Sequence, residues 1–403
     1  MRYQKPSVFH YRLAQGVSWL VSKTIFHKKV LRNEIRGVKG PYVVIANHQA
    51  ALDFVNLIGA TSRPMHFVIS KSFFSTLPVQ GFMWKMGVIP KQQFQTSADD
   101  LKKMKTAIKH GQPVVIYPAG LMCEDGLSTP IPAATYKFLK WLDVDVYVAR
   151  SRGTYFVMPK WSKGLRPGRT YMDIYKLFSK EELKQMPLEQ VREKTNDALL
   201  FDAYREQDIH PEKYRKNRNI EGLEHVLYQC PHCGEEFTMQ VRDGSVIACA
   251  ACGFTQECDS FGLLHKVDGP GMEIRYVSDW SRMINNQLKW KLTRNPNASL
   301  TAQTQIFMVT DGKKKFTQAG SAAVTLNAAG FTLEGTLRDA PWQLHVPIGS
   351  IPTLPFSPGR YFEIQDGPDI YRCVLSDGKL VMKFINMVKV FYELNTKEKA
   401  PIG

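Results

Sequence analysis

The 403-residue chain is too long for a single hydrophobic core, so its length predicts two or three domains. With 44% hydrophobic and 22% charged residues it has the composition of a globular protein, which excludes a mainly disordered chain. The formal net charge of +16 favours an anionic partner, either nucleic acid or an acidic membrane surface, and a solvated basic face that binds nothing explains it equally well.

Residues 1–40 form a basic, amphipathic N-terminal segment. Glu34 is the single acidic residue of this segment. Its basic residues are Arg2, Lys5, Arg12, Lys23, Lys28, Lys29, Arg32, Arg36 and Lys39. Apolar residues recur at helical spacing and are Phe9, Leu13, Val17, Leu20, Val21 and Ile25, with Trp19 nearby. This stripe predicts a helix that docks on the protein's own core, the commoner case, or lies in a membrane interface. No signal-peptide pattern and no run of eighteen apolar residues occur, so no spanning helix is expected.

Residues 41–205 alternate apolar strands with amphipathic helices. Strands are expected at 42–46, 66–70, 114–117 and 144–149. A helix is expected over 97–111, because a Ser97 to Asp100 capping box opens it and Gly111 closes it. This alternation predicts an α/β domain with a largely parallel sheet that carries helices on its faces.

The stretch 43–54, VVIANHQAALDF, places Asp53 five residues after His48. Residues five apart on a regular helix point about 140° away from one another, so the two side chains meet only if His48 lies on the loop and Asp53 begins the helix. An aspartate there could hold the imidazole in one tautomer and stabilise its positive charge. The alternative is a loop histidine followed by an N-cap aspartate, and the spacing alone favours this alternative.

The remaining chain divides into a linker at 206–226, a cysteine-rich segment at 227–260, a helical connector at 261–298 and a β domain at 299–403. The linker is polar and strongly charged and offers few core residues. Short β-forming runs separated by Gly, Pro, Asn and Asp predict the small β domain, which ends in a helix. Its order and length resemble those of pleckstrin-homology or GRAM-type domains.

Four of the seven cysteines form two pairs with matching spacing. Fifteen residues separate the pairs, whose members are Cys230 and Cys233, then Cys249 and Cys252. This is the spacing of a four-cysteine zinc ribbon, in which Gly234 and Gly253 permit the tight turns. Four thiolates fill a tetrahedral shell, so Zn²⁺ is expected to be structural, and His232 is expected to be exposed. The alternative is four reduced cysteines in a β-hairpin; the odd total fits a reducing cytoplasm in either case.

Three blocks in residues 41–205 resemble the glycerolipid acyltransferase family of the 1-acylglycerol-3-phosphate type. The first block of that family is Asn-His-x-x-x-x-Asp, which corresponds to Asn47, His48 and Asp53. The second is a glycine, apolar residues and an arginine, where this chain has GVIPK at 87–91. The third is an aromatic residue, Pro, Glu and Gly after a strand, where this chain has YPAG at 117–120. The order of these blocks reverses the preference for a structural histidine and aspartate.

The resemblance implies that a fatty acyl group moves from an acyl-CoA or acyl-carrier-protein thioester to the hydroxyl of a lysophospholipid. His48 would be the general base and Asp53 its orienting partner. The implied substrate-binding residues are Asn47, Lys91, Tyr117, Pro118 and Gly120. Lys91 keeps the charge of the family's arginine without its two-pronged geometry. Ala119 replaces the family's glutamate, which predicts a changed acceptor or a weakened enzyme, and Glu124 and Asp125 are the candidates to supply the carboxylate.

The leading hypothesis is therefore a phospholipid-synthesis acyltransferase, cytoplasmic and peripheral on the inner face of an anionic membrane. One alternative is a lipid-binding module that keeps the acyltransferase fold without turnover. A second is a zinc-ribbon nucleic-acid-binding protein. No nucleic-acid partner is expected, because aromatic and basic residues do not alternate on an identifiable binding sheet.

Overall fold

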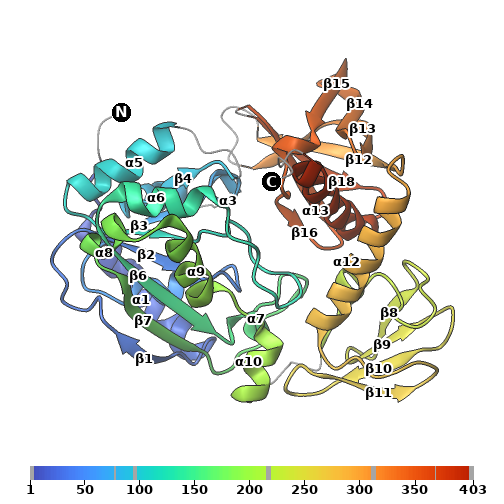
Figure 1. Cartoon of the computed structure of the whole chain (residues 1–403), viewed down its shortest axis with the longest axis horizontal. Helices are drawn as coiled ribbons and strands as arrows, with labels where there is room; N and C mark the ends of the chain where they lie inside the picture. The colour runs from blue at the N-terminus through green and yellow to red at the C-terminus, as the bar shows by residue number, and fades with distance from the viewer. Residues whose placement is uncertain are drawn as a thin grey trace. The chain divides into compact units, whose positions relative to one another are not determined.

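The computed structural model describes residues 4–76, 79–93, 98–214, 219–309, 315–367 and 369–398. The chain divides into two compact units. Unit 1 comprises Met1–Lys160, Gly164–Asn217 and Ser260–Gly262, and unit 2 comprises Trp161–Lys163, Arg218–Asp259 and Leu263–Gly403. Figure 1 shows the elements of both units. Among the residues that the structure describes, no helix combines the length and apolarity needed to span a bilayer.

Unit 1 contains a seven-stranded sheet with the order β1-β7-β6-β2-β5-β3-β4. Every pairing in it is parallel except that of β6 with β7, so the predicted α/β class with a largely parallel sheet is confirmed. The strands are β1 (Lys29–Asn33), β2 (Tyr42–Ala46), β3 (His66–Ser70), β4 (Ile89–Lys91), β5 (Val114–Ile116), β6 (Asp145–Arg152) and β7 (Tyr171–Phe178). The predicted strands 42–46 and 66–70 are confirmed to the residue.

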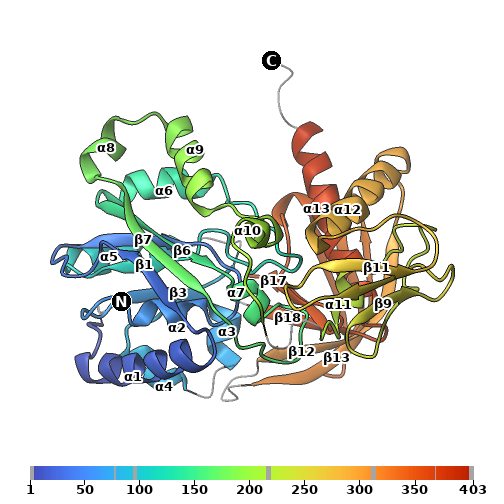
Figure 2. The ribbon, with the colours of Figure 1, turned by 90° about the horizontal axis from the view of Figure 1, so that it is seen from below.

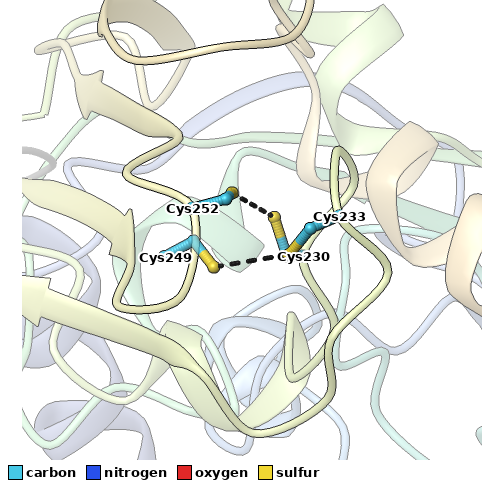
Figure 3. A group of neighbouring side chains, drawn as sticks. All are labelled: Cys230, Cys233, Cys249 and Cys252. Carbon is cyan, nitrogen blue, oxygen red and sulfur yellow. Dashed lines mark hydrogen bonds between the residues drawn. The ribbon is translucent and has the colours of Figure 1, made fainter.

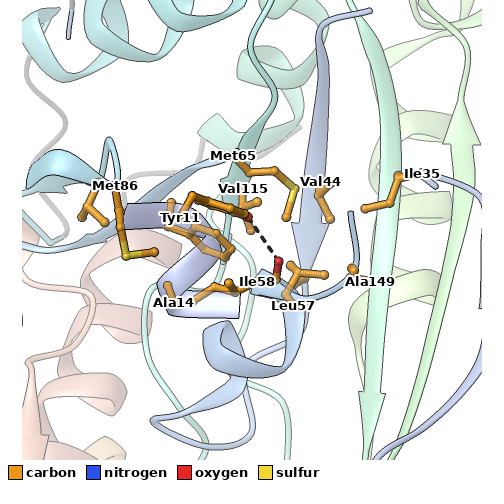
Figure 4. Close-up of a cluster of buried hydrophobic side chains, with 14 of the residues drawn as sticks. Tyr11, Ala14, Ile35, Val44, Leu57, Ile58, Met65, Met86, Val115 and Ala149 are labelled. Carbon is orange, nitrogen blue, oxygen red and sulfur yellow. Dashed lines mark hydrogen bonds between the residues drawn. The ribbon is translucent and has the colours of Figure 1, made fainter. Parts of the chain in front are cut away.

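Both faces of this sheet are covered, because successive residues of a strand point to opposite sides. Val44 of β2 joins one hydrophobic cluster with Tyr11 and Leu57, and Figure 4 shows this cluster. Val43 joins the other, with Leu139. Figure 2 shows α1, α2 and α4 on one side of the sheet and α6, α8 and α9 on the other. The sheet is therefore a fixed platform for the loops at its edges.

The helices of unit 1 are mostly short. They are α1 (Val8–Thr24), α2 (Asp53–Ile58), α3 (Lys71–Thr76), α4 (Gln80–Lys85), α5 (Ala98–Lys109), α6 (Ala134–Leu142), α7 (Thr154–Val157), α8 (Lys180–Gln185), α9 (Leu188–Leu199) and α10 (Ala203–Ile209). The predicted helix over 97–111 corresponds to α5, and Gly111 follows it with φ of 74°. Ser97 of the predicted capping box lies outside the described residues.

Most of the apolar stripe of helix α1 points away from the core, whereas the commoner case predicted that it would pack on the core. Its buried residues are Tyr11, Ala14, Ser18 and Ser22, whereas Phe9, Leu13, Val17 and Leu20 are all more than half exposed. The helix packs on the core through Tyr11 and Ala14, which join the hydrophobic cluster. Hydrogen bonds also hold it: Ser22 Oγ donates to Asn56 Oδ1 at 2.9 Å, and Ser18 Oγ donates to the carbonyl of Val55. The prediction that the whole apolar stripe packs on the core is wrong, because only Val21 and Ile25 of that stripe are half-buried.

The segment 206–226, expected to be a polar linker at a domain boundary, contains the point at which the chain passes from unit 1 to unit 2, after Asn217. It contains the end of α10 and a short helix, α11 (Leu223–Val226), and Tyr214 and Leu223 are buried. Tyr214 fills the space above Gly168, where an added Cβ would lie 2.1 Å from the ring. The described residues of this linker thus include a buried tyrosine and a few buried aliphatic residues.

Unit 2 holds two antiparallel sheets and two long helices. The first sheet has the order β11-β10-β9-β8 and the second β15-β14-β13-β12-β18-β17-β16. The strands are β8 (Met239–Arg242), β9 (Val246–Cys249), β10 (Thr255–Cys258), β11 (Leu264–Asp268), β12 (Leu300–Val309), β13 (Phe316–Asn327), β14 (Gly330–Leu337), β15 (Ala340–Pro347), β16 (Phe356–Ser357), β17 (Tyr361–Asp366) and β18 (Asp369–Leu375). The helices are α12 (Val277–Arg294), the 3₁₀ turn η1 (Ile348–Ser350) and α13 (Leu380–Glu398).

The predicted mainly-β C-terminal region with a final helix is confirmed. The apolar face of α13 is buried, as Phe384 and Val388 illustrate with no exposed surface. The connector expected to be helical over 261–298 begins instead with β11, which pairs with β10 and extends the cysteine-rich sheet to Asp268. Polar residues interrupt the apolar ones in this strand, so the sequence there contains no apolar run that would predict it.

Candidate active site and metal site

His48 and Asp53 meet at the carboxyl edge of the parallel sheet. His48 lies on the loop that follows β2, and Asp53 is the first residue of α2. Nδ1 of His48 lies 3.1 Å from Oδ2 of Asp53. The His48 side chain is 21% exposed, whereas that of Asp53 is fully buried.

Asp53 also holds the loop that carries His48. Its Oδ2 accepts hydrogen bonds from the backbone N–H groups of Gln49, at 2.7 Å, and Ala50, at 2.8 Å. The N-cap of α2 is Leu52, so the alternative that made Asp53 the N-cap is wrong. An ionised carboxylate can only accept a hydrogen bond, so this contact fits the His48 tautomer that carries its proton on Nδ1. Nε2 is then left with a lone pair that can accept a proton.

Tyr117 packs beside the imidazole. The two ring centroids are 4.6 Å apart with an interplanar angle of 39°. Burial raises the pKa of Tyr117 well above its usual value, and the charge of Asp53 raises it further. The phenol is thus neutral at physiological pH. The turn that follows, 117–120, is closed by a hydrogen bond from the N–H of Gly120 to the carbonyl of Tyr117 at 3.0 Å, and Gly120 adopts φ of 70°.

Asn47 was expected to bind substrate, but both polar atoms of its side-chain amide form hydrogen bonds within the protein. Its Nδ2 donates to the carbonyl of Ser151 and its Oδ1 accepts from the N–H of Ser151, both at 2.8 Å. The residue ties the end of β2 to β6. Sequence reasoning also missed Gln49, whose Oε1 accepts from Thr154 Oγ1 at 3.1 Å. Both partners are about a hundred positions away, so no local pattern indicates these bonds.

Lys91 ends β4 on the same edge of the sheet. Its Nζ donates to the carbonyl of Gln92 at 3.0 Å. Burial lowers the pKa of Lys91, and the charge of Asp100 only partly opposes that effect. Pro118 and Ala119 are half-buried in the neighbouring turn. The arrangement places a desolvated cation near the strand end that precedes the turn.

Two carboxylates follow the turn and are buried. Glu124 and Asp125 have 7% and 6% of their surface exposed. Oδ1 of Asp125 accepts from the N–H of Leu127 at 3.0 Å. Burial raises the pKa of Cys123, and the charges of Asp125, Glu124 and Asp53 raise it further, so these groups share one neighbourhood. The N–H of Cys123 in turn donates to the carbonyl of His48 at 3.4 Å.

The four paired cysteines converge in unit 2, as Figure 3 shows. Their sulfurs all lie within 4.8 Å of one another, with 3.6 Å between Cys230 and Cys252 and 3.8 Å between Cys233 and Cys249. Sulfurs bound tetrahedrally to one zinc ion at about 2.3 Å are about 3.8 Å apart, so the cluster could hold such an ion. Gly234 and Gly253 both have φ of 78°, as the two tight turns require, and His232 is exposed as predicted.

Residues 24–160 match the model of the acyltransferase family. This range contains His48, Asp53, Lys91 and the turn 117–120. The matched range includes strands β1 to β6 of the mostly parallel sheet, so this part of the chain is similar to the acyltransferase family.

Within that class, the chain is similar to 1-acyl-sn-glycerol-3-phosphate acyltransferases. It is 30% identical over 128 residues to the chloroplastic BAT2 of Brassica napus and 29% identical over 128 residues to the chloroplastic LPAT1 of Arabidopsis thaliana. The aligned part is 31% of this chain, and it spans only 37% and 35% of those relatives. The crystal structure of PlsC, the 1-acyl-sn-glycerophosphate acyltransferase of Thermotoga maritima, aligns with a TM-score of 0.42 and 15% identity, over 50% of this chain and 80% of PlsC.

Proposed function

We propose that the protein transfers a fatty acyl group from an acyl-CoA or acyl-carrier-protein thioester to the hydroxyl of a lysophospholipid of the lysophosphatidic acid type. The observation that carries this proposal is the contact of His48 Nδ1 with a fully buried Asp53 carboxylate, which leaves the other imidazole nitrogen available. The similarity to the two plant enzymes supports the substrate class.

In the proposed reaction, Nε2 of His48 removes the proton from the acceptor hydroxyl as the oxygen attacks the thioester carbonyl carbon. The carbon–sulfur bond then breaks, and the imidazolium returns its proton to the departing thiolate. Asp53 stabilises the imidazolium that exists between these two proton transfers. The products are the diacylated phospholipid and the free thiol.

Lys91 is the group that we expect to meet the phosphate of the acceptor. It is a half-buried lysine whose pKa is lowered by burial, and an incoming phosphate would add to the charge of Asp100 in stabilising the ammonium. Tyr117, Pro118 and Gly120 would contact the substrate from the neighbouring turn. For Asn47 the hydrogen bonds to Ser151 support a role in positioning the loop of His48.

The outward apolar face of α1 supports work at a membrane surface, where both a lysolipid and an acyl chain reside. Phe9 is 73% exposed and Trp19 is 62% exposed, and the ammonium of Lys23 lies 4.9 Å from the Trp19 ring centroid. An amphipathic helix with basic flanks binds an anionic bilayer in two ways: its apolar face is buried among the lipids, and its basic residues are attracted to the anionic headgroups. We place the enzyme peripherally on the inner, cytoplasmic face, to which seven cysteines without a disulfide are suited.

We infer that the four-cysteine cluster binds zinc in a structural role. Four thiolates complete a tetrahedral shell, and no position remains for a reacting water. The cluster belongs to unit 2, whereas His48 and Asp53 belong to unit 1. With its shell filled by four thiolates, the metal would stabilise the sheet that carries them and take no part in acyl transfer.

A second candidate function keeps the fold and omits the reaction. Ala119 stands where the resembling family has a glutamate, and the nearby Glu124 and Asp125 are buried. A protein of this kind would bind a lysolipid or an acyl chain without turnover.

One experiment separates the two. Purified wild-type protein is incubated with mixed lysophospholipids and each thioester donor, and products are identified by mass spectrometry. The His48→Ala variant is expected to form no product above background, while the matched control His210→Ala, at the end of α10, keeps wild-type activity. Undiminished product from His48→Ala would refute the catalytic role, and binding without product from the wild type would favour the second candidate.

A further inference from the structure

Gln93 lies on the loop after β4 and contacts two other strand ends at once. Its Nε2 donates to the carbonyl of Gly120 at 2.6 Å. Its Oε1 accepts from Oγ of Ser70, the last residue of β3, at 3.0 Å. We propose that Gln93 is a positioning residue that holds the 117–120 turn in place beside His48. This inference rests on the acyl-transfer function proposed above.

The order of the strands explains why one side chain can do this. The strands β4, β3, β5 and β2 are neighbours in the sheet, and all of them run parallel. Their carboxyl ends therefore lie side by side on one edge. Gln93 follows β4, Ser70 ends β3, the turn follows β5, and His48 follows β2. The amide spans from the outer strand to the turn that packs on the imidazole.

The bond to Gly120 fixes more than one atom. The carbonyl of Gly120 and the N–H of Leu121 share one rigid peptide plane, so the direction of one sets the direction of the other. Gly120 has φ of 70°, a conformation that glycine adopts at little cost and leaves as easily. A side-chain tether is therefore the means by which a flexible turn keeps one orientation. The N–H of Gly120, in the preceding peptide plane, closes the same turn on the carbonyl of Tyr117, whose ring contacts His48.

The bridge needs a side chain that donates and accepts at this length. A glutamine amide does both: it donates a hydrogen bond to the carbonyl of Gly120 and accepts one from the hydroxyl of Ser70. A glutamate has the same length, but its ionised form can only accept, so it would face the Gly120 carbonyl without a proton. Its protonated form can donate again. Gln93→Glu therefore turns the tether into one that depends on pH.

The test compares kcat and KM for lysolipid acylation in Gln93→Ala, Gln93→Glu and Ser70→Ala, with the exposed Gln190→Ala of α9 as a matched control. Gln93→Ala is expected to lower kcat by about tenfold with little change in KM, because a misplaced turn harms the reaction more than ground-state binding. Ser70→Ala should have a smaller effect, and the double variant should be no worse than Gln93→Ala, since both changes break one bridge.

The pH dependence of the Gln93→Glu variant distinguishes a positioning role from a purely structural one, because a purely structural role would not make the activity ratio depend on pH. Its activity relative to wild type should rise as the pH falls and the introduced carboxyl gains a proton. The titratable groups around this loop, which are Lys91, Asp100, Asp53, His48, Glu124 and Asp125, are present in both proteins, so the ratio removes the part of the pH profile that the two proteins share. A ratio that is flat with pH, or a kcat of Gln93→Ala equal to that of Gln190→Ala, would overturn the proposal.

Hydrogen exchange measured by mass spectrometry separates this proposal from the proposed function. Peptides that cover residues 117–123 should exchange faster in Gln93→Ala than in wild type or Gln190→Ala. If the wild type shows no turnover with any lysolipid, the acyl-transfer function fails, while faster exchange would still establish the tether. Unchanged exchange in Gln93→Ala would refute the tether whatever the activity.

Discussion

The carboxylate of Asp53 contacts the imidazole of His48 with the same oxygen that accepts two backbone N–H groups from the loop between them. The loop is thereby closed on its own aspartate, and the imidazole has a fixed direction before any substrate arrives. A side chain that is preorganised in this way loses little entropy when the reaction begins. The charge of Asp53 and its two backbone contacts can be tested separately.

We predict that Asp53→Asn lowers kcat by roughly 100- to 10,000-fold, because the amide cannot stabilise the imidazolium. The fold should survive, since the remaining oxygen can still accept from the loop. Asp53→Ala should in addition lower the free energy of unfolding by about 1–3 kcal/mol, because it leaves buried N–H groups without an acceptor. Steady-state kinetics and urea denaturation measure the two effects. Equal unfolding free energies for both variants would contradict the structural half of this prediction.

We predict that Lys91→Met raises the KM for a phosphate-bearing acceptor about tenfold or more, as loss of one charge-assisted hydrogen bond implies. Burial lowers the pKa of Lys91, so the unfolded chain holds this proton to a higher pH than the folded chain does. Stability therefore increases with pH across that window, and the charge costs stability below it. Lys91→Met should thus unfold at the same or a higher urea concentration. The exposed Lys102→Met of α5 is the matched control, and an unchanged KM in Lys91→Met would exclude phosphate recognition.

The metal site offers a prediction about unit 2 alone. Buried Trp280 of α12 donates its indole N–H to the carbonyl of Gln229 at 2.9 Å, one residue before Cys230. We expect about one zinc ion per chain by elemental analysis. Cys233→Ser should lose the metal, loosen the cysteine turn and shift the tryptophan emission to longer wavelength as Trp280 meets water. The adjacent, equally exposed His232→Ala should keep the metal. Full metal content in Cys233→Ser would show that a different set of ligands binds it.

The sequence predicted those parts of the fold that depend on local patterns. Apolar runs located β2 and β3, and the spacing of Cys230 and Cys249 with their partners predicted a cluster that the structure assembles. The bonds that shape the candidate site are long-range: Asn47 to Ser151 and Gln93 to Gly120 join residues whose relation only the folded sheet creates. No pattern in one sequence carries that information.

The orientation of α1 was mispredicted for a related reason. An apolar stripe is expected to face the core, because burying it gains the most free energy. Here the polar edge of the helix is held by α2, where the carbonyl of Val55 and the side chain of Asn56 accept its serine hydroxyls. The orientation of α1 therefore depends on the groups that α2 presents to it, and the position of α2 depends on the fold of unit 1.

That outward stripe leads to the last prediction, which concerns membrane binding. Leu13 and Val17 are each 55% exposed on the outer face of α1. The double change Leu13→Asp and Val17→Asp should weaken binding to vesicles of phosphatidylcholine and phosphatidylglycerol by at least about tenfold, because two apolar contacts become charges that the lipid repels. The melting temperature should stay close to that of wild type, since neither side chain packs in the core.

The matched control is Ile209→Asp, an equally drastic change at a residue of α10 that is 71% exposed. It should leave vesicle binding unchanged if α1 is the part of the chain that contacts lipid. Sedimentation with vesicles of increasing phosphatidylglycerol content measures both variants and also tests the basic residues, whose attraction to the bilayer should weaken as salt is added. Binding that survives the α1 substitutions but fails in Ile209→Asp would place the membrane contact on α10, and α1 would then need another explanation for its exposed apolar face.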